Sequence, residues 1–243
     1  MAIYRANMAA HTQGHNTATF AGLNQLHADG HVRAPRPNNT WSIGVDSDTV
    51  CGVTRFYSGQ GYSNGEEHTA NASKPAPGVA LHTRSLVHLR GKAFVVVDRF
   101  TSDRPRTARV FWHAHPDVHT SWDAGSATLR LQHMAGPESV TIASAAAKRW
   151  ANVSIVRGSD RPIQGWYSPH YNVKEPSDAS IFEHPVRAGS TVVAWLIVAS
   201  KESGAAAVAP MVEIVSATDD AVTVTYRLGD GANATLTVAM CSE

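Results

Sequence analysis

The sequence predicts an all-β protein, built as a large antiparallel β-sandwich. Apolar and β-branched residues recur with a period of two along many short runs, and no stretch of comparable length shows a helical period. Turn residues join neighbouring runs. Many short strands at this spacing are typical of sandwiches of antiparallel sheets.

The predicted strands follow one another along the whole chain. They cover residues 17–21, 41–45, 49–57, 79–89, 93–100, 108–115, 127–132, 139–143, 152–156, 191–199, 212–217, 221–227 and 234–240. Tight turns are expected at Gly91-Lys92, Asp219-Asp220 and Gly229-Asp230-Gly231. Residues 59–77 predict a long loop, because they are rich in Gly, Ser, Asn and Pro, and residues 143–151 predict one short helical turn.

Length and charge narrow the class of protein. The 243 residues can bury a sizeable core, and we expect a single domain over residues 1–243. The 21 Lys and Arg nearly balance the 20 Asp and Glu, which argues against nucleic acid or a heavily sulfated chain as partner. No apolar run approaches the length of a membrane span, and residues 1–10 lack the apolar segment of a signal peptide. Cys51 and Cys241 could form one disulfide bridge, but a single pair does not indicate an oxidising or a reducing compartment, so the compartment stays unknown.

Histidine is the compositional anomaly, with 13 in the chain. His113 and His115 lie two apart at the end of a predicted strand, where both imidazoles would project from one face. They could form a metal pair, with Asp117 or His119 as the nearest third ligand of a zinc ion. Alternatively, one of these histidines packs under a loop and hydrogen-bonds a carbonyl.

A second polar cluster lies near the start of the chain, at Tyr4, His11, His15 and Asn16. β-Elimination on a uronic acid removes the proton at C5 and protonates the leaving oxygen at C4, so it needs a base, an acid and a group that neutralises the carboxylate. Tyr and His can transfer the proton, and Asn can act as the neutraliser. The alternative is a turn at the entry of a strand, in which Asn16 caps the backbone.

Arg84 lies on a predicted strand and shares one face with His82. An arginine on the inner face of a sheet needs a carboxylate, and Asp98 at the end of the next run is the expected partner. Arg84 is either a second neutraliser or one half of a structural ion pair.

The segment 165–176 clusters aromatic residues, a histidine and prolines. Trp166, Tyr167, His170 and Tyr171 could hold a pyranose ring, whose apolar face suits aromatic side chains. The alternative is that these aromatic residues pack in the core or at its edge.

Three segments of the chain resemble the heparinase II/III-like polysaccharide lyases. They are Gly14-His15-Asn16-Thr17 with Gly22 and Gln25; Arg84 followed by residues 93–98 and 113–117; and Gly165-Trp166-Tyr167-Ser168 with Tyr171 and Glu175-Pro176. That family joins an N-terminal α-helical toroid to a C-terminal antiparallel β-sandwich and cleaves uronic-acid polysaccharides by β-elimination. The resemblance implies that His15 is a ligand of a zinc ion and that Tyr4 takes part in proton transfer.

The toroid of that family, with its Asn, His and Tyr catalytic groups, has no counterpart in this sequence, and neither does the segment that supplies the other zinc ligands. We therefore carry three hypotheses. The chain is a lyase of an acidic polysaccharide or its sandwich domain, a carbohydrate-binding sandwich, or a module that docks an α-toroid domain. Near-neutral charge favours a less charged polyuronate such as alginate over heparin, with heparan sulfate retained as a candidate.

Overall fold

The computed structural model describes residues 14–20, 24–25, 41–43, 49–57, 80–145, 150–170, 173–201, 208–229 and 231–241. Within these ranges the elements are β-strands, and all their pairings are antiparallel. The predicted all-β sandwich is confirmed. In this described part of the chain, no helix has the length and hydropathy required to cross a membrane.

Three sheets make up the body of the protein. The four-stranded sheet has the order β1 (Ala18–Phe20), β7 (Arg106–His113), β16 (Asp178–Val186), β11 (Asn152–Arg157). The nine-stranded sheet has the order β2 (Asn24–Gln25), β4 (Thr49–Tyr57), β5 (Ala80–Leu89), β6 (Ala93–Ser102), β17 (Gly189–Ser200), β10 (Ser139–Ser144), β9 (Thr128–His133), β8 (Val118–Asp123), and β3 (Trp41–Ile43) pairs with β4. The three-stranded sheet is β18 (Met211–Ala217), β19 (Ala221–Arg227), β20 (Ala234–Ala239).

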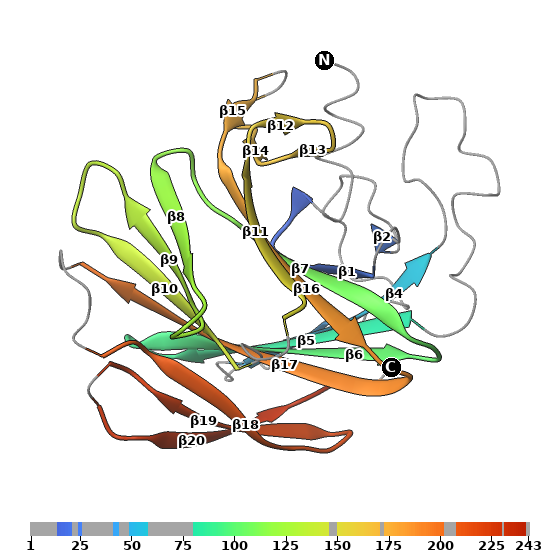
Figure 1. Cartoon of the computed structure of the whole chain (residues 1–243). Helices are drawn as coiled ribbons and strands as arrows, with labels where there is room; N and C mark the ends of the chain where they lie inside the picture. The colour runs from blue at the N-terminus through green and yellow to red at the C-terminus, as the bar shows by residue number, and fades with distance from the viewer. Residues whose placement is uncertain are drawn as a thin grey trace.

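Two small hairpins project beyond these sheets. They are β12 (Ser159–Asp160) with β13 (Ile163–Gln164), and β14 (Trp166–Tyr167) with β15 (Glu175–Pro176). In Figure 1 both lie at the top of the molecule, above β11 and β16.

The sheets form three layers with two cores. The four-stranded and three-stranded sheets lie on opposite sides of the nine-stranded sheet (Figure 1). On β6, Val96 and Phe100 join the core under the four-stranded sheet, whereas Val95 and Val97 join the core over the three-stranded sheet. A strand that is buried on both faces reads as a continuous apolar run, which explains the sequence of β6.

Polar links and one disulfide join the three-stranded sheet to the middle layer. Cys51 on β4 is bonded to Cys241, just after β20, with their Cα atoms 5.9 Å apart. The Ser85 hydroxyl donates to the Ala239 carbonyl at 2.7 Å, and Arg99 donates to two carbonyls of the β18–β19 turn. The predicted bridge is therefore formed.

The structure corrects several predicted elements. Neither β16 nor β8 was among the expected strands, and β16 carries no clear apolar alternation. Residues 143–144 belong to β10 rather than to the expected helical turn, of which residues 146–149 are not described. The expected loop at 59–77 also lies outside the described residues.

Candidate functional site

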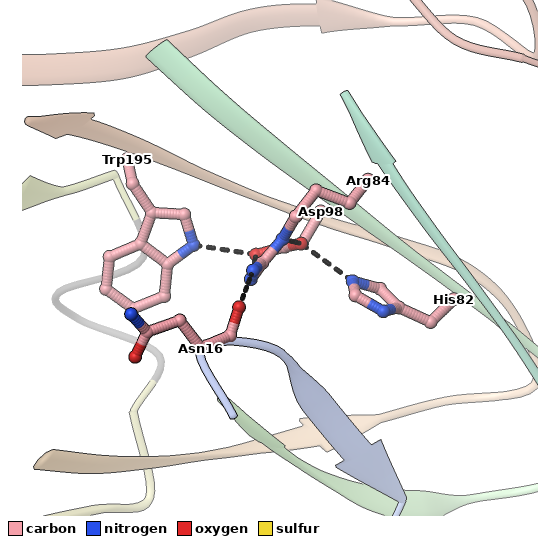
Figure 2. A network of polar contacts seen from close by, with 5 residues as sticks. All are labelled: Asn16, His82, Arg84, Asp98 and Trp195. Carbon is pink, nitrogen blue, oxygen red and sulfur yellow. Dashed lines mark hydrogen bonds and ion pairs between the residues drawn. The ribbon is translucent and has the colours of Figure 1, made fainter. Parts of the chain in front are cut away.

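Asp98 is the centre of a buried polar network on the inner face of the nine-stranded sheet (Figure 2). Its Oδ1 accepts from His82 Nε2 at 2.7 Å and from Arg84 Nε at 2.6 Å. Its Oδ2 accepts from Arg84 Nη2 and from Trp195 Nε1, both at 2.9 Å. We call His82, Arg84, Asp98 and Trp195 the Asp98 network. The expected Arg84–Asp98 pair is confirmed, and its two members are directly opposite each other on β5 and β6.

The network fixes the ionisation of its members. Burial raises the pKa of Asp98, but the charge of Arg84 and the hydrogen bonds from His82 and Arg84 outweigh it, so that this pKa lies well below its usual range. Burial lowers the pKa of His82, and the hydrogen bond to Asp98 opposes that lowering only in part. Asp98 is therefore a carboxylate, and His82 is a neutral imidazole that donates from Nε2.

Arg84 links this buried network to the segment around Asn16. Its third donor, Nη1, binds the main-chain oxygen of Asn16 at 2.6 Å (Figure 2). The guanidinium carbon lies 5.3 Å from the centre of the Trp112 ring, within range of a cation–π contact. The guanidinium thus binds Asp98 through two nitrogens and Asn16 through the third, and the carboxylate of Asp98 balances its charge. Arg84 fits the structural ion pair better than a substrate neutraliser.

The side chain of Asn16 is held by a second strand. Its Oδ1 accepts from the main-chain N–H of His113 at 2.6 Å. Because a main-chain N–H can only donate, the amide oxygen must face it, and the amide NH2 group is left to donate elsewhere. Asn16 is exposed, and Figure 2 shows its amide on the opposite side of the residue from Arg84. Asn16 therefore presents a hydrogen-bond donor at the surface.

The end of β7 joins this segment to the projecting hairpin β14–β15. β7 ends at His113, so His115 lies in the following connection and the two histidines do not share a strand face as expected. His115 instead packs against the ring of Tyr167 on β14, with centroids 5.1 Å apart. Its Nδ1 accepts from the Asp117 main-chain N–H at 3.3 Å. Both rings are exposed, and Tyr167 exposes 37% of its surface.

The other aromatic candidates differ from Tyr167. Trp166 donates from Nε1 to the Ser159 carbonyl at 2.8 Å, and Lys174 Nζ lies 3.8 Å from its ring centre. One face of Trp166 is therefore covered, and the packing alternative describes it better than an open sugar platform. His170 is exposed, with its carbonyl accepting from Ser168 Oγ at 3.1 Å. Tyr171 lies outside the described residues.

The N-terminal candidates are described only in part. His15 is exposed beside Asn16, whereas Tyr4 and His11 lie outside the described residues. Among the side chains that the structure describes, no group of three or more His, Cys, Asp or Glu could hold a metal ion. We therefore derive no step through zinc, and the zinc ion expected at His15, His113 and His115 stays a prediction.

Three of the segments singled out in the sequence meet at one edge of the sandwich. Asn16, the end of β7 and Tyr167 are connected through His113 and His115. We call His15, Asn16, His113, His115 and Tyr167 the edge site.

Trp195 and Trp112 contact the residues that hold the edge site in place, Asp98 and Arg84, and were not among the residues predicted from the sequence. Trp195 lies in an apolar run like its neighbours. Nothing in the sequence indicates that its indole N–H reaches Asp98.

A separate cavity of about 760 Å³ lies on the other side of the middle sheet. Its lining includes Arg99 on β6 and Glu213 on β18. Asp98 and Arg99 are neighbours on a strand and point to opposite faces, so this cavity does not open toward the edge site. We place the candidate site at the edge, where exposed donors converge.

The chain belongs to the family described as Heparinase II/III-like, C-terminal, which matches residues 4–196. Its fold is similar to that of solved lyases. A structure of heparinase III aligns with a TM-score of 0.62 and 12% identity over 94% of this chain, and heparan sulfate lyase HepC from Pedobacter heparinus aligns with a TM-score of 0.59 and 18% identity over 94%. The chain spans 30% of the length of each of these proteins. No curated protein matches it.

Proposed function

We propose that this chain is the sandwich part of a polysaccharide lyase that cleaves a uronic-acid polysaccharide by β-elimination. The observation that carries the proposal is the locked amide of Asn16, which offers its NH2 group at an exposed edge beside His15, His113, His115 and Tyr167. Membership in the heparinase II/III-like family supports the reaction class.

The edge site has the groups that the reaction needs. A base removes the proton at C5 of the uronate, the electron pair of that C–H bond forms a C4–C5 double bond, and the C4–O bond breaks as the leaving oxygen takes a proton. The Asn16 amide donates to the uronate carboxylate and so stabilises the negative charge that develops there. His15 lies next to Asn16 and takes the role of proton-transfer group, together with Tyr4 and His11.

Tyr167 and His115 are proposed to bind sugar. Their exposed rings meet at a tilted angle of 59°, which forms an apolar corner with polar atoms at its rim. A pyranose has the same character, with an apolar face and hydroxyl edges. The substrate we propose is a polyuronate of low sulfation such as alginate, since the net charge of the chain is only +1.

An α-toroid domain is proposed as the partner that completes the substrate cleft, because the chain covers 30% of the similar lyases. A non-catalytic carbohydrate-binding module is the second candidate, and the exposed Tyr167–His115 pair favours it.

The test uses the purified chain with alginate, heparan sulfate, hyaluronan and chondroitin, and follows the ultraviolet absorbance of the unsaturated uronate. The decisive variant is Asn16→Asp, which keeps an oxygen for the His113 N–H but replaces the NH2 donor with a negative charge. We expect its activity to fall at least 100-fold, as for an oxyanion-hole donor. His88→Ala, at the far end of β5, is the matched control and keeps full activity. A flat trace of the unmodified chain on all four substrates would refute catalysis by this chain alone, and would favour the binding module or a sandwich that acts only together with an α-toroid domain.

A further inference from the structure

We propose that Asp98 is a positioning residue, which acts through Arg84 to hold the Asn16 amide in its donor orientation. The catalytic consequence rests on the proposed function, whereas the coupling between Asp98 and Asn16 does not. It deepens the role of the edge site by naming the buried groups that set its geometry.

The first step is the fixed position of Arg84. Nε and Nη2 of its planar guanidinium both bind the Asp98 carboxylate, so the plane and direction of the group are defined. Asp98 cannot turn away, because His82 and Trp195 bind its two oxygens from the sides. His82 is itself stacked on Phe100, with ring centroids 5.1 Å apart.

The second step is the contact by which the fixed Arg84 guanidinium holds Asn16 at the surface. The donor of Arg84 that faces outward, Nη1, meets the main-chain oxygen of Asn16, 68 residues away in sequence. The His113 N–H meets the side-chain oxygen of the same residue. Asn16 is thus held at two points, one from β5 and one from β7, and its NH2 group is left to donate outward.

The third step separates positioning from stability. Another Arg–carboxylate pair, Arg109 with Glu183, joins β7 to β16 at 2.7 Å and forms no hydrogen bond with Asn16. Arg109 lies on the same strand as His113, and the pair, although more exposed than Arg84–Asp98, is a control for the loss of an ion pair on β7. If ion pairs merely stabilised the sandwich, neutralising either pair would have similar local effects at Asn16.

The experiment measures hydrogen exchange at the His113 amide in the whole chain. Single variants leave a buried charge unpaired, so the test variant is the neutral double substitution Arg84→Gln with Asp98→Asn, and the control is Arg109→Gln with Glu183→Gln. We expect exchange at His113 to become at least tenfold faster in the test variant and to stay within twofold in the control. The amide of the buried Val224, on β19 of the three-stranded sheet, reports global opening and should not change in either.

Two results would overturn the inference. One is unchanged exchange at His113 in the test variant. The other is equal acceleration at His113 and Val224, which would mean a purely structural role. In a lyase assay, the test variant should lower kcat more than tenfold with KM changed less than threefold. If exchange responds as expected while the unmodified chain shows no lyase activity, the positioning stands and catalysis by this chain alone is refuted.

Discussion

Gly165 closes the base of the hairpin that carries Tyr167, and its replacement by alanine tests how the edge site is held. Its φ is +75°, in the left-handed region that favours glycine. An added Cβ would lie 2.4 Å from the Val156 carbonyl oxygen and 2.8 Å from the Arg157 Cα. Both of these atoms are main chain, so β11 or the hairpin must move.

The expected loss is worked out from four contributions. A left-handed alanine is disfavoured by roughly 1–2 kcal/mol, and the reduced entropy of the unfolded chain returns about 0.4–1 kcal/mol. Relief of the overlap adds roughly 1–3 kcal/mol. The Gly165 carbonyl accepts from the N–H groups of Gly158 at 2.7 Å and Ser177 at 3.0 Å, and weakening these bonds adds to the loss. We expect Gly165→Ala to destabilise the chain by about 2–4 kcal/mol.

Gly91→Ala is the matched control for the left-handed conformation alone. Gly91 has a φ of +68°, and an added Cβ meets nothing within 4 Å. It should lose about 1 kcal/mol or less. Urea unfolding followed by tryptophan fluorescence measures both variants. Equal losses for Gly165→Ala and Gly91→Ala would refute the reasoning, because the overlap with Val156 would then have no energetic effect.

Three further predictions concern the Asp98 network, the disulfide and Tyr167. Folding lowers the pKa values of both His82 and Asp98, so each group stabilises the fold above its unfolded pKa and this stabilisation is lost as the pH falls. Urea unfolding at a series of pH values should show a first loss of stability below about pH 6.5 and a second below about pH 4, and His82→Gln should abolish the first. Reduction of the Cys51–Cys241 bridge, which joins residues 190 apart, should lower stability by up to about 5 kcal/mol in the chain-entropy account, and a thermal melt of Cys51→Ser without loss would contradict it. Tyr167→Ala should weaken polyuronate binding about tenfold in calorimetry, against unchanged binding if the sugar does not reach this edge.

Contacts could be predicted from the sequence where the two residues lie on strands that follow each other in the chain. The Arg84–Asp98 pair was predictable because β5 and β6 are joined by the tight turn at Gly91-Lys92, which sets the register. The alternating and continuous apolar runs located most strands for the same reason: local burial leaves a local pattern.

A strand could not be predicted where its buried positions carry polar rather than apolar residues. β16 places Asp178, Ser180 and His184 on its inner face, so polar residues occupy positions that normally identify a strand. Pro185 also reads against a central strand, but the pairing of β11 ends at Glu183, so the missing N–H of Pro185 leaves no bond to β11 unmade. β16 is nevertheless the strand that joins β7 to β11.

The residues of the candidate site could be chosen from the sequence, but the contacts between them could not. His15, Asn16 and Tyr167 were chosen for their chemistry and for the family resemblance, and the strand face that His113 and His115 were expected to share was wrong because β7 ends at His113. Which residues meet depends on pairings between distant segments. One example is Phe111 N–H with the Thr17 carbonyl, which brings the start of β1 alongside β7.

A buried ion pair adds little net stability compared with apolar residues of similar volume, because the desolvation of both charges offsets their attraction. What the Arg84–Asp98 pair supplies, and apolar residues cannot, is direction. Because the Asp98 carboxylate fixes Nε and Nη2 of the Arg84 guanidinium, the direction of Nη1 is also fixed, and Nη1 donates to Asn16. In the proposed reaction, the edge site requires a donor held at a defined angle more than another attractive contact. A fixed Asn16 amide would then not have to reorient as charge develops on a uronate carboxylate, and this preorganisation is the advantage that a buried network can give an exposed site.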